Sequence, residues 1–273
     1  MKTEKRKNFS LLIFLRYQVV HLLPISLKMN LVVDVGNTLI KMAVFEKETA
    51  ALLFKETAIK TNFKLLLDKV IAAYPAIERV GVSAVGDLSE AQQLRLRKIA
   101  PVFEVTSQAK LPFKNQYATP NTLGVDRIAL VSAAVKTYPK INALVVDCGS
   151  CVTYDFVDMK NNYLGGAISP GLSMRYKAMH TFTKNLPLLD INAPVSFVGN
   201  STTNAMHAGV VYGICAEIDG MIERYKQKYK DLTVILTGGD AHFLRENIKN
   251  GIFANSNFLL EGLNYLLEIN SDR

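Results

Sequence analysis

The sequence contains no tryptophan and no tract rich in glycine and serine, in glutamine or in proline. Hydrophobic residues make up 49% of its 273 residues, and charged residues only 21%. Disordered and fibrous chains have the opposite balance or a repetitive composition, so these absences exclude both classes. The sequence therefore predicts a globular protein of one or two domains with large buried cores.

Cysteine is scarce as well, since only Cys148, Cys151 and Cys215 occur. An odd number without framework spacing does not suit a disulfide scaffold and predicts a reducing, cytoplasmic location. Cys148 and Cys151 form a C-x-x-C pattern, which also occurs in redox and metal sites. No second C-x-x-C and no nearby histidine pair completes a metal set, so we interpret both as small structural residues.

The formal net charge of +8 is concentrated at one end of the chain. Residues 1–28 hold six basic residues and one acidic residue, so five of the eight surplus charges lie there. The remaining surplus is ordinary for an enzyme with anionic substrates. No run of lysine and arginine interleaved with aromatic residues follows, which argues against a nucleic-acid partner.

Residues 1–28 superficially resemble a signal peptide, because a basic start precedes an apolar stretch. Arg16, Gln18 and His21 interrupt that stretch, and no small-residue cleavage site follows. The stretch is also too short to span a membrane. The first strong strand pattern begins just after Met29, so we expect Met29 to be the true start. Residues 1–28 are then an extension outside the fold, and their deletion should leave activity unchanged.

An acidic hairpin pattern occurs twice. In residues 31–46, two apolar runs are joined by a turn containing glycine and asparagine, which is typical of a β-hairpin. Residues 143–158 repeat this pattern 113 positions later, which aligns Asp34 with Asp147. With the strands and helices that follow each hairpin, the sequence predicts two β-β-β-α-β-α halves. We place the boundary in the irregular segment 107–122, giving halves 29–116 and 117–273.

The turn of the first hairpin suits phosphate binding, because glycine lets backbone N–H groups approach phosphate oxygens closely. Lys41 adds a positive charge, and Asp34 is placed to hold a hydrated Mg²⁺. A plain hairpin turn explains the segment alone equally well. The candidate ATP-binding residues here are Asp34, Val35, Gly36, Asn37, Thr38, Leu39, Ile40 and Lys41.

The two acidic hairpins together resemble the ATP grip of the actin, sugar-kinase and Hsp70 superfamily. This resemblance implies an α/β fold of two duplicated, ribonuclease H-like halves with mixed sheets and a cleft between them. Residues 237–241, with the sequence TGGDA, follow an apolar strand and open a helix, where two glycines allow a nucleotide to approach. The structural alternative is a strand-to-helix turn with Asp240 as its cap.

Further motifs resemble those of type III pantothenate kinases. Residues 117–127, YATPNTLGVDR, resemble the family's substrate motif, whose core is G-x-D-R. Residues 147–153, 165–171 and 199–209 resemble its D-x-G-T-A-x-T, G-G-x-I-x-P-G and G-x-N-T-x-x-A-x-x-x-G motifs, and TGGDA matches outright. The resemblance runs from Met29 to the C-terminus in the family's order. Ser150, Cys151 and Ser201 depart from the usual residues, but none of these changes removes a charged group.

The resemblance implies that the chain transfers a phosphoryl group from ATP to pantothenate, giving 4′-phosphopantothenate for coenzyme A synthesis. It implies that Asp126 accepts the proton, that Asp147 binds K⁺ or NH₄⁺, and that Ser150 contacts ATP. Thr202 would reach the substrate across a homodimer interface. The implied substrate-binding residues are Tyr117, Gly124, Val125, Asp126, Arg127 and Thr202.

Two other functions remain open at this point. A non-catalytic regulator resembling this family, such as an accessory factor for transcription, could keep the hairpins and lose Asp126. The presence of both Asp126 and Arg127 favours an enzyme. A kinase of the same superfamily could act on a sugar or a carboxylate, but the extended Y-x-x-P-x-x-L-G-x-D-R string argues against that.

Overall fold

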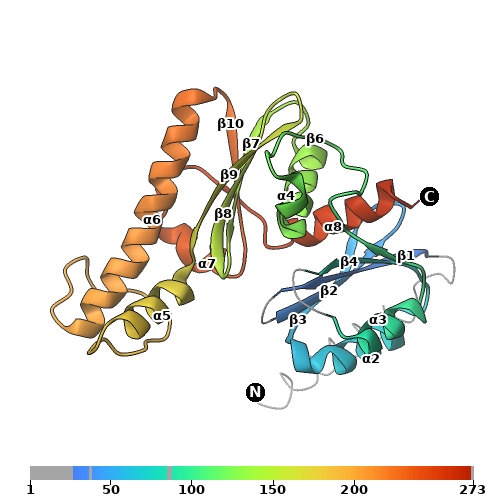
Figure 1. Ribbon diagram of the computed structural model, residues 1–273, viewed down its shortest axis with the longest axis horizontal. Coiled ribbons are helices and arrows are strands. Elements are labelled where there is room, and N and C mark those ends of the chain that lie inside the picture. Colours follow the sequence, from blue (N-terminus) through green and yellow to red (C-terminus); the bar gives the residue numbers. More distant parts are fainter. Residues whose placement is uncertain (1–26, 37–38, 85–87, 272–273) are drawn as a thin grey trace, which may run out of the picture. The chain divides into compact units, whose positions relative to one another are not determined.

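The computed structural model describes residues 27–36, 39–84 and 88–271 (Figure 1). The predicted extension therefore lies almost wholly outside the described residues. The chain divides into two compact units, Met1–Val105 and Thr106–Arg273. The segment 106–116, predicted to lie in the first half, belongs to the second unit. The reason is that β6 (Lys114–Asn115) pairs with β9 (Asn162–Pro170) of that unit.

The described part of the first unit is a mixed sheet of five strands in the order β3-β2-β1-β4-β5. The central strand, β1, is antiparallel to β2 and parallel to β4. All seven residues of β1 are buried, as in a strand covered on both faces. The elements in chain order are β1 (Met29–Val35), β2 (Leu39–Glu46), β3 (Leu52–Ile59), η1 (Lys60–Asn62), α2 (Phe63–Ala73), β4 (Ile77–Ala84), α3 (Glu90–Arg97) and β5 (Val102–Glu104).

Local sequence explains α2 and α3, the α-helices in the described part of the first unit. α2 buries Phe63, Leu66, Leu67 and Val70, which recur at the spacing of one helix face. α3 begins after Ser89, whose side chain accepts a hydrogen bond from the backbone N–H of Gln92, while the Gln92 side chain accepts one from the backbone N–H of Ser89. This reciprocal capping box satisfies N–H groups that a helix start leaves unpaired.

The second unit repeats the first. In its described part, strands β9, β8, β7, β10 and β11 stand in the same order as β3, β2, β1, β4 and β5, and β6 is added at the edge. Asp34 and Asp147 each lie near the end of the central strand, opposite Ser83 and Thr237 on the parallel neighbour. The predicted duplication is therefore confirmed.

The elements of the second unit after β6 are η2 (Pro120–Thr122), α4 (Val125–Thr137), β7 (Asn142–Cys148), β8 (Cys151–Val157), β9 (Asn162–Pro170), α5 (Leu172–Phe182), α6 (Thr202–Lys228), β10 (Leu232–Thr237), α7 (Ala241–Leu244), η3 (Arg245–Asn247), β11 (Phe253–Ala254) and α8 (Phe258–Ile269).

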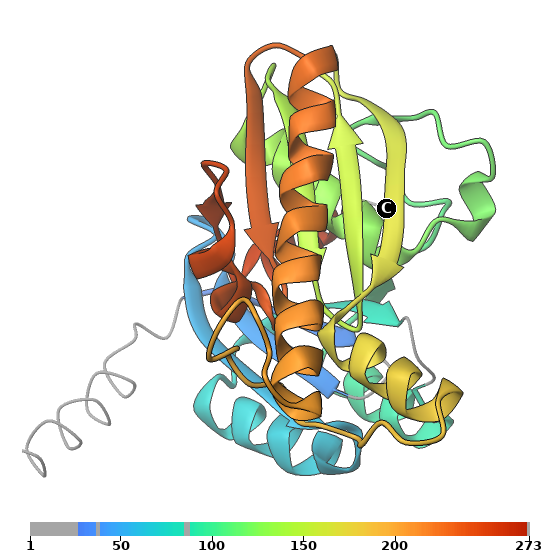
Figure 2. The ribbon, with the colours of Figure 1, turned by 90° about the vertical axis from the view of Figure 1, so that its left-hand side faces the viewer.

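Helices cover both faces of the second sheet. The long α6 runs along one face, and α4 and α8 lie against the other (Figures 1 and 2). α6 buries Val211, Ile214, Ile218 and Ile222 against Tyr154 and its neighbours. Among the described residues, no helix combines the length and the apolar character that a bilayer span requires.

The contact between α4 and α8 depends on a glycine. A Cβ atom on Gly262 would lie 1.9 Å from the carbonyl oxygen of Ala129, so only glycine lets the backbones approach this closely. We expect Gly262→Ala to lower the free energy of unfolding by about 1–3 kcal/mol, the usual cost of overpacking. Gly220→Ala is the control, because its Cβ would meet nothing within 4 Å and should raise helix stability instead. Chemical denaturation of both variants measures the difference, and equal midpoints would contradict the expectation.

Candidate active site

The first-unit hairpin places a carboxylate beside an ammonium group. Asp34 and Lys41 are opposite one another in the β1–β2 register, and Lys41 Nζ lies 3.2 Å from Asp34 Oδ2. Asp34 is only 4% exposed, and the turn closes with a hydrogen bond from Gly36 N to Leu39 O of 2.9 Å. The predicted ATP contacts Asn37 and Thr38 lie outside the described residues. The hairpin thus holds groups of both charges where the sequence predicted phosphate and Mg²⁺ binding.

The second hairpin is enclosed by the turn that follows β10. A Cβ on Gly238 would lie 2.4 Å from Asp147 Oδ1 and 2.3 Å from Cys148 O, and Gly238 has a φ of +100°. Only glycine fits this approach and this backbone conformation without strain. Asp240 N donates to Cys148 O over 2.9 Å, which fixes the turn against the hairpin. The motif TGGDA therefore brings backbone atoms to the Asp147 carboxylate.

The oxygen atoms at this hairpin suit a hard cation. The Asp147 carboxylate and the neighbouring backbone carbonyl groups are oxygen donors, which such cations prefer. Within the described residues, no group of three or more His, Cys, Asp or Glu side chains could hold a metal ion. A site at Asp147 would therefore consist of one carboxylate with carbonyl oxygens, which is a donor set for a weakly bound cation.

The cysteines of the C-x-x-C pattern are free thiols. Burial, and then the nearby Asp147 carboxylate, raise the pKa of the Cys148 thiol well above its ordinary value. Because the thiolate is the reactive form, this thiol is inert at neutral pH. The structural interpretation of the pattern fits this environment.

The G-x-D-R motif shapes the start of α4. Asp126 folds back so that its Oδ1 accepts a hydrogen bond of 2.8 Å from the backbone N–H of Arg127. A Cβ on Gly124 would lie 2.3 Å from that same Oδ1. The glycine therefore makes room for the carboxylate, and this explains its place two residues before the aspartate. Oδ2 of Asp126 has no hydrogen-bond partner among the described residues and is free to accept one.

Arg127 is buried and paired with a second carboxylate. Its side chain is 6% exposed, and Nε donates to Asp155 Oδ1 over 2.8 Å. Tyr163 donates its hydroxyl to the same oxygen over 2.7 Å, and Thr153 donates to Oδ2 over 3.2 Å. Burial raises the pKa of Asp155 to about 6, against the lowering effects of Arg127, Tyr163 and Thr153. The arginine is thus held from one side by a hydrogen-bond network centred on the fully buried Asp155.

Tyr117 covers the guanidinium group. The Cζ of Arg127 lies 5.5 Å from the centre of the Tyr117 ring, and that ring stacks on Tyr163 at 6.1 Å. Gly165 has a φ of +99°, and a Cβ there would lie 3.2 Å from the Tyr117 ring. The substrate motif and the G-G motif therefore meet at Tyr117, so the structure brings together Tyr117, Gly124, Asp126 and Arg127.

Two predicted site residues lie apart from this group. Thr202 is exposed at the start of α6, which lies on the sheet face opposite α4 (Figure 1). Ser150 is exposed at the tip of the β7–β8 turn, where its carbonyl oxygen accepts a hydrogen bond from Gly171 N over 3.1 Å. Neither residue shares a hydrogen bond with Asp126 or Arg127 within the described residues.

Asp155, which pairs with Arg127, and Tyr163, which donates to Asp155, were not predicted as site residues. The available signal was an acidic residue inside the apolar strand 151–157, because a buried carboxylate needs a partner. That signal predicts that Asp155 has a partner, but it does not identify Arg127 as that partner.

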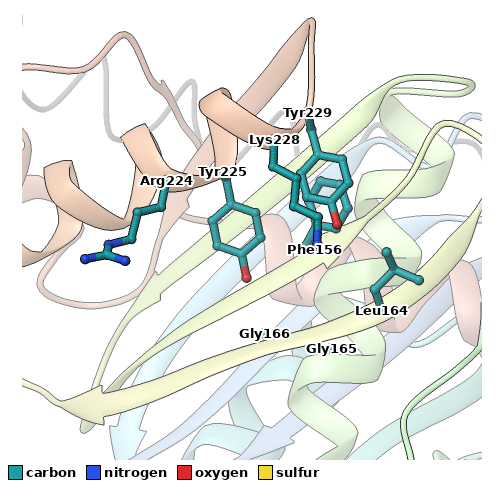
Figure 3. A pocket seen from close by; sticks show the side chains of 8 residues that line it. All are labelled: Phe156, Leu164, Gly165, Gly166, Arg224, Tyr225, Lys228 and Tyr229. Atoms are coloured by element: carbon teal, nitrogen blue, oxygen red, sulfur yellow. The ribbon is translucent and has the colours of Figure 1, made fainter.

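A hollow of about 440 Å³ lies elsewhere, between β8, β9 and the end of α6 (Figure 3). Tyr229 stacks on Phe156 at 4.1 Å, and Lys228 extends beside them (Figure 3). None of the predicted site residues lines this hollow, so we do not count it as part of the candidate active site.

Comparisons with known proteins point to one family. Residues 30–224 match the family model described as type III pantothenate kinase. A protein of that name from Christiangramia forsetii is 48% identical over 242 residues, covering 89% of this chain and 99% of the relative. Another from Flavobacterium johnsoniae is 46% identical over 246 residues, covering 89% of this chain and 100% of the relative.

Solved structures agree on the fold. A candidate Baf family transcriptional activator from Campylobacter jejuni has a TM-score of 0.57 at 20% identity, covering 89% of this chain and 100% of its own. A candidate N-acetylmannosamine kinase from Listeria monocytogenes has a TM-score of 0.52 at 12% identity, covering 90% and 100%. At these identities the likeness shows the fold alone.

Proposed function

Because this chain belongs to the type III pantothenate kinase family, we propose that it transfers the γ-phosphoryl group of ATP to the primary hydroxyl of pantothenate. The observation that supports this most directly is the start of α4, where Asp126 keeps one carboxylate oxygen unengaged and is followed directly by the buried Arg127. A coupled assay of ADP release with pantothenate tests the proposal. A protein that releases no ADP when pantothenate is added would overturn it.

In the proposed reaction, Asp126 accepts the proton of the substrate hydroxyl through Oδ2, while Oδ1 stays bonded to the helix backbone. The substrate oxygen forms a bond to the γ-phosphorus as the bond to the ADP oxygen breaks. A carboxylate is a weak base, but phosphoryl transfer depends mainly on positioning and on stabilising charge. Tyr117, Gly124, Val125 and Arg127 hold the substrate in this proposal.

The hairpins would hold the nucleotide. Asp34 would bind Mg²⁺, Lys41 and the backbone of residues 35–40 would contact phosphates, and Ser150 would contact ATP. Mg²⁺ would supply positive charge to the transferring phosphoryl group. The chain offers Lys41 here as its cationic side chain, so a monovalent cation at Asp147 would neutralise further phosphate charge.

We therefore expect activity to depend on K⁺ or NH₄⁺. Replacing K⁺ with Na⁺ should raise the KM for ATP, and Asp147→Ala should raise it about tenfold, as for the loss of one charged contact. The variant should also lose its response to K⁺. Initial rates across ATP concentrations in K⁺, Na⁺ and a bulky organic cation provide the measurement. Identical rates in all three salts would show that no such cation site exists.

We also propose that the chain forms a homodimer through α6. Gly209 and Gly213 are exposed on this helix, and a Cβ on either would meet nothing within 4 Å. Each glycine inside a helix lowers helix stability by about 1 kcal/mol relative to alanine. Glycine at these positions is therefore explained if the backbone of another helix packs closely against them. They line an apolar hollow of about 490 Å³ with Phe197, which is 77% exposed.

The connector before α6 extends this apolar surface. Its exposed large side chains are Leu188, Val195, Phe197 and Val198, and Phe182 at the end of α5 adds to them. An exposed apolar patch of this kind marks an interaction surface. Thr202 follows this connector and is exposed at the start of α6, which suits the expectation that this residue reaches the substrate of a partner subunit.

The regulatory alternative receives no support, because the curated relatives are named as kinases and Asp126 and Arg127 are both in place. We propose a cytoplasmic location, which the three free thiols support.

A further inference from the structure

We propose that Asp155 is a positioning residue for substrate recognition, which holds Arg127 by its Nε edge so that its Nη2 edge faces the substrate. Asp155 itself lies on β8 and has no exposed surface, so it would act through Arg127. This inference rests on the proposed function, because it assigns Arg127 to the binding of pantothenate.

The first argument comes from the hydrogen bonds of Arg127. Nε is engaged with Asp155, whereas Nη2 is buried and has no hydrogen-bond partner among the described residues. A buried donor without a partner costs free energy, and an acceptor on a ligand would remove that cost. Because the guanidinium group is a rigid planar fork, fixing Nε also fixes the direction of Nη2.

The second argument comes from charge. A buried cation without a counter-ion is strongly unfavourable, and Asp155 is the carboxylate that forms an ion pair with Arg127 in the described residues. Asp126 does not form this ion pair, because its Oδ1 accepts a hydrogen bond from the backbone N–H of Arg127 instead. The two carboxylates are therefore divided between two tasks, proton acceptance at Asp126 and orientation at Asp155.

The third argument comes from the residues around the pair. Tyr163 donates to Asp155 and stacks on Tyr117, and Tyr117 in turn lies over the Arg127 guanidinium. Arg127 is thus enclosed by Asp155 along one edge and by an aromatic ring on one face. Such a group is fixed before the substrate arrives, and a fixed group loses less entropy on binding.

Asp155→Asn tests the proposal, because it removes the charge and keeps the shape. We expect the KM for pantothenate to rise about 10- to 100-fold, as for a weakened charged hydrogen bond, with the KM for ATP unchanged. Tyr163→Phe, which removes one hydrogen bond to Asp155 and keeps the ring, should act in the same direction and more weakly. Asp158→Asn is the control, since this carboxylate lies in the β8–β9 turn and binds only the turn itself.

A double-mutant cycle distinguishes positioning from a general structural role. If Asp155 acts through Arg127, then Asp155→Asn should cause little further loss in a protein that already carries Arg127→Ala. An equal loss in both backgrounds would overturn the proposal. So would an equal change in the KM for ATP.

The pH profile gives another expected result. As the pH falls through about 6, Asp155 takes up a proton and loses its ion pair with Arg127, so kcat/KM for pantothenate should fall. Tyr163 and, from α6, Tyr225 are the other titratable groups that interact with Asp155. The ratio of kcat/KM for pantothenate in the wild type to that in Asp155→Asn should therefore fall below pH 6. A ratio that stays constant with pH would count against the proposal.

A measurement without substrate separates this proposal from the proposed function. In ¹⁵N-labelled protein, the Nε–H signal of Arg127, identified by its loss in Arg127→Lys, should exchange slowly with water. In Asp155→Asn it should shift and exchange faster. If the wild type does not phosphorylate pantothenate, the proposed function fails, while this signal still reports whether Asp155 holds Arg127. A signal that is the same in both proteins would overturn the positioning role.

Discussion

Asp126→Asn is expected to lower kcat with pantothenate by about 10²–10⁴-fold, the usual loss when a general base is removed. Asparagine keeps the Oδ1 atom that accepts the backbone N–H of Arg127, so the start of α4 should stay intact. The Oδ2 position becomes an amide group, which donates hydrogen bonds and cannot take the substrate proton. This variant therefore removes the group that accepts the proton without disturbing the start of α4.

The measurement combines steady-state kinetics with calorimetric titration of ATP. ATP affinity should be nearly unchanged, because the proposed nucleotide contacts come from the two hairpins. Asp158→Asn provides a matched loss of one carboxylate in the same unit and should keep full activity. An Asp126→Asn protein with wild-type kcat would remove Asp126 from the mechanism.

Gly209→Arg is expected to dissociate the proposed dimer and to lower kcat/KM for pantothenate by about 10- to 100-fold, as for one or two lost hydrogen bonds to substrate. The arginine would project from the apolar face of α6, where a partner helix would have to bury its charge. The monomer itself should tolerate the change, because a Cβ on Gly209 meets nothing within 4 Å. ATP affinity should stay as in the wild type.

Sedimentation gives the oligomeric state, and circular dichroism verifies that the variant is folded. Gly251→Arg is the control, because it makes the same substitution in an exposed loop where a Cβ also meets nothing. A wild-type protein that sediments as a monomer would refute the dimer. A Gly209→Arg protein that is monomeric and fully active would show that Thr202 does not contact the substrate of a partner subunit.

The strands and hairpins were predictable because their signals are local. Residues 31–46 and 143–158 each form two paired strands as expected, and the repeat of Asp34 as Asp147 matches the equivalent strands β1 and β7. The boundary between the units was misplaced because β6 has only two residues. Its membership of the second unit depends on pairing with β9, which no local pattern indicates.

The candidate site was predictable in part, for a related reason. The residues of G-x-D-R stand side by side in the sequence, and the structure explains Gly124 and Asp126 together. The partner of Arg127 is Asp155, which lies 28 positions away on a strand of the sheet that α4 packs against. A buried ion pair between a helix and a strand leaves no periodic trace in the sequence, so the network around Asp155 emerged only from the fold.

Helix α4 is buried along its whole body, from Arg127 to Val135. Its backbone amides should therefore exchange with solvent only when much of the second unit unfolds, which makes them the slowest class in the protein. Residues 183–201, between α5 and α6, are mostly exposed and contain no helix or strand. Their amides belong to the fastest class. Association with a partner subunit should thus slow exchange in residues 183–201. Binding of pantothenate should leave exchange in α4 unchanged, because the guanidinium of Arg127 extends from a part of the chain that is already rigid.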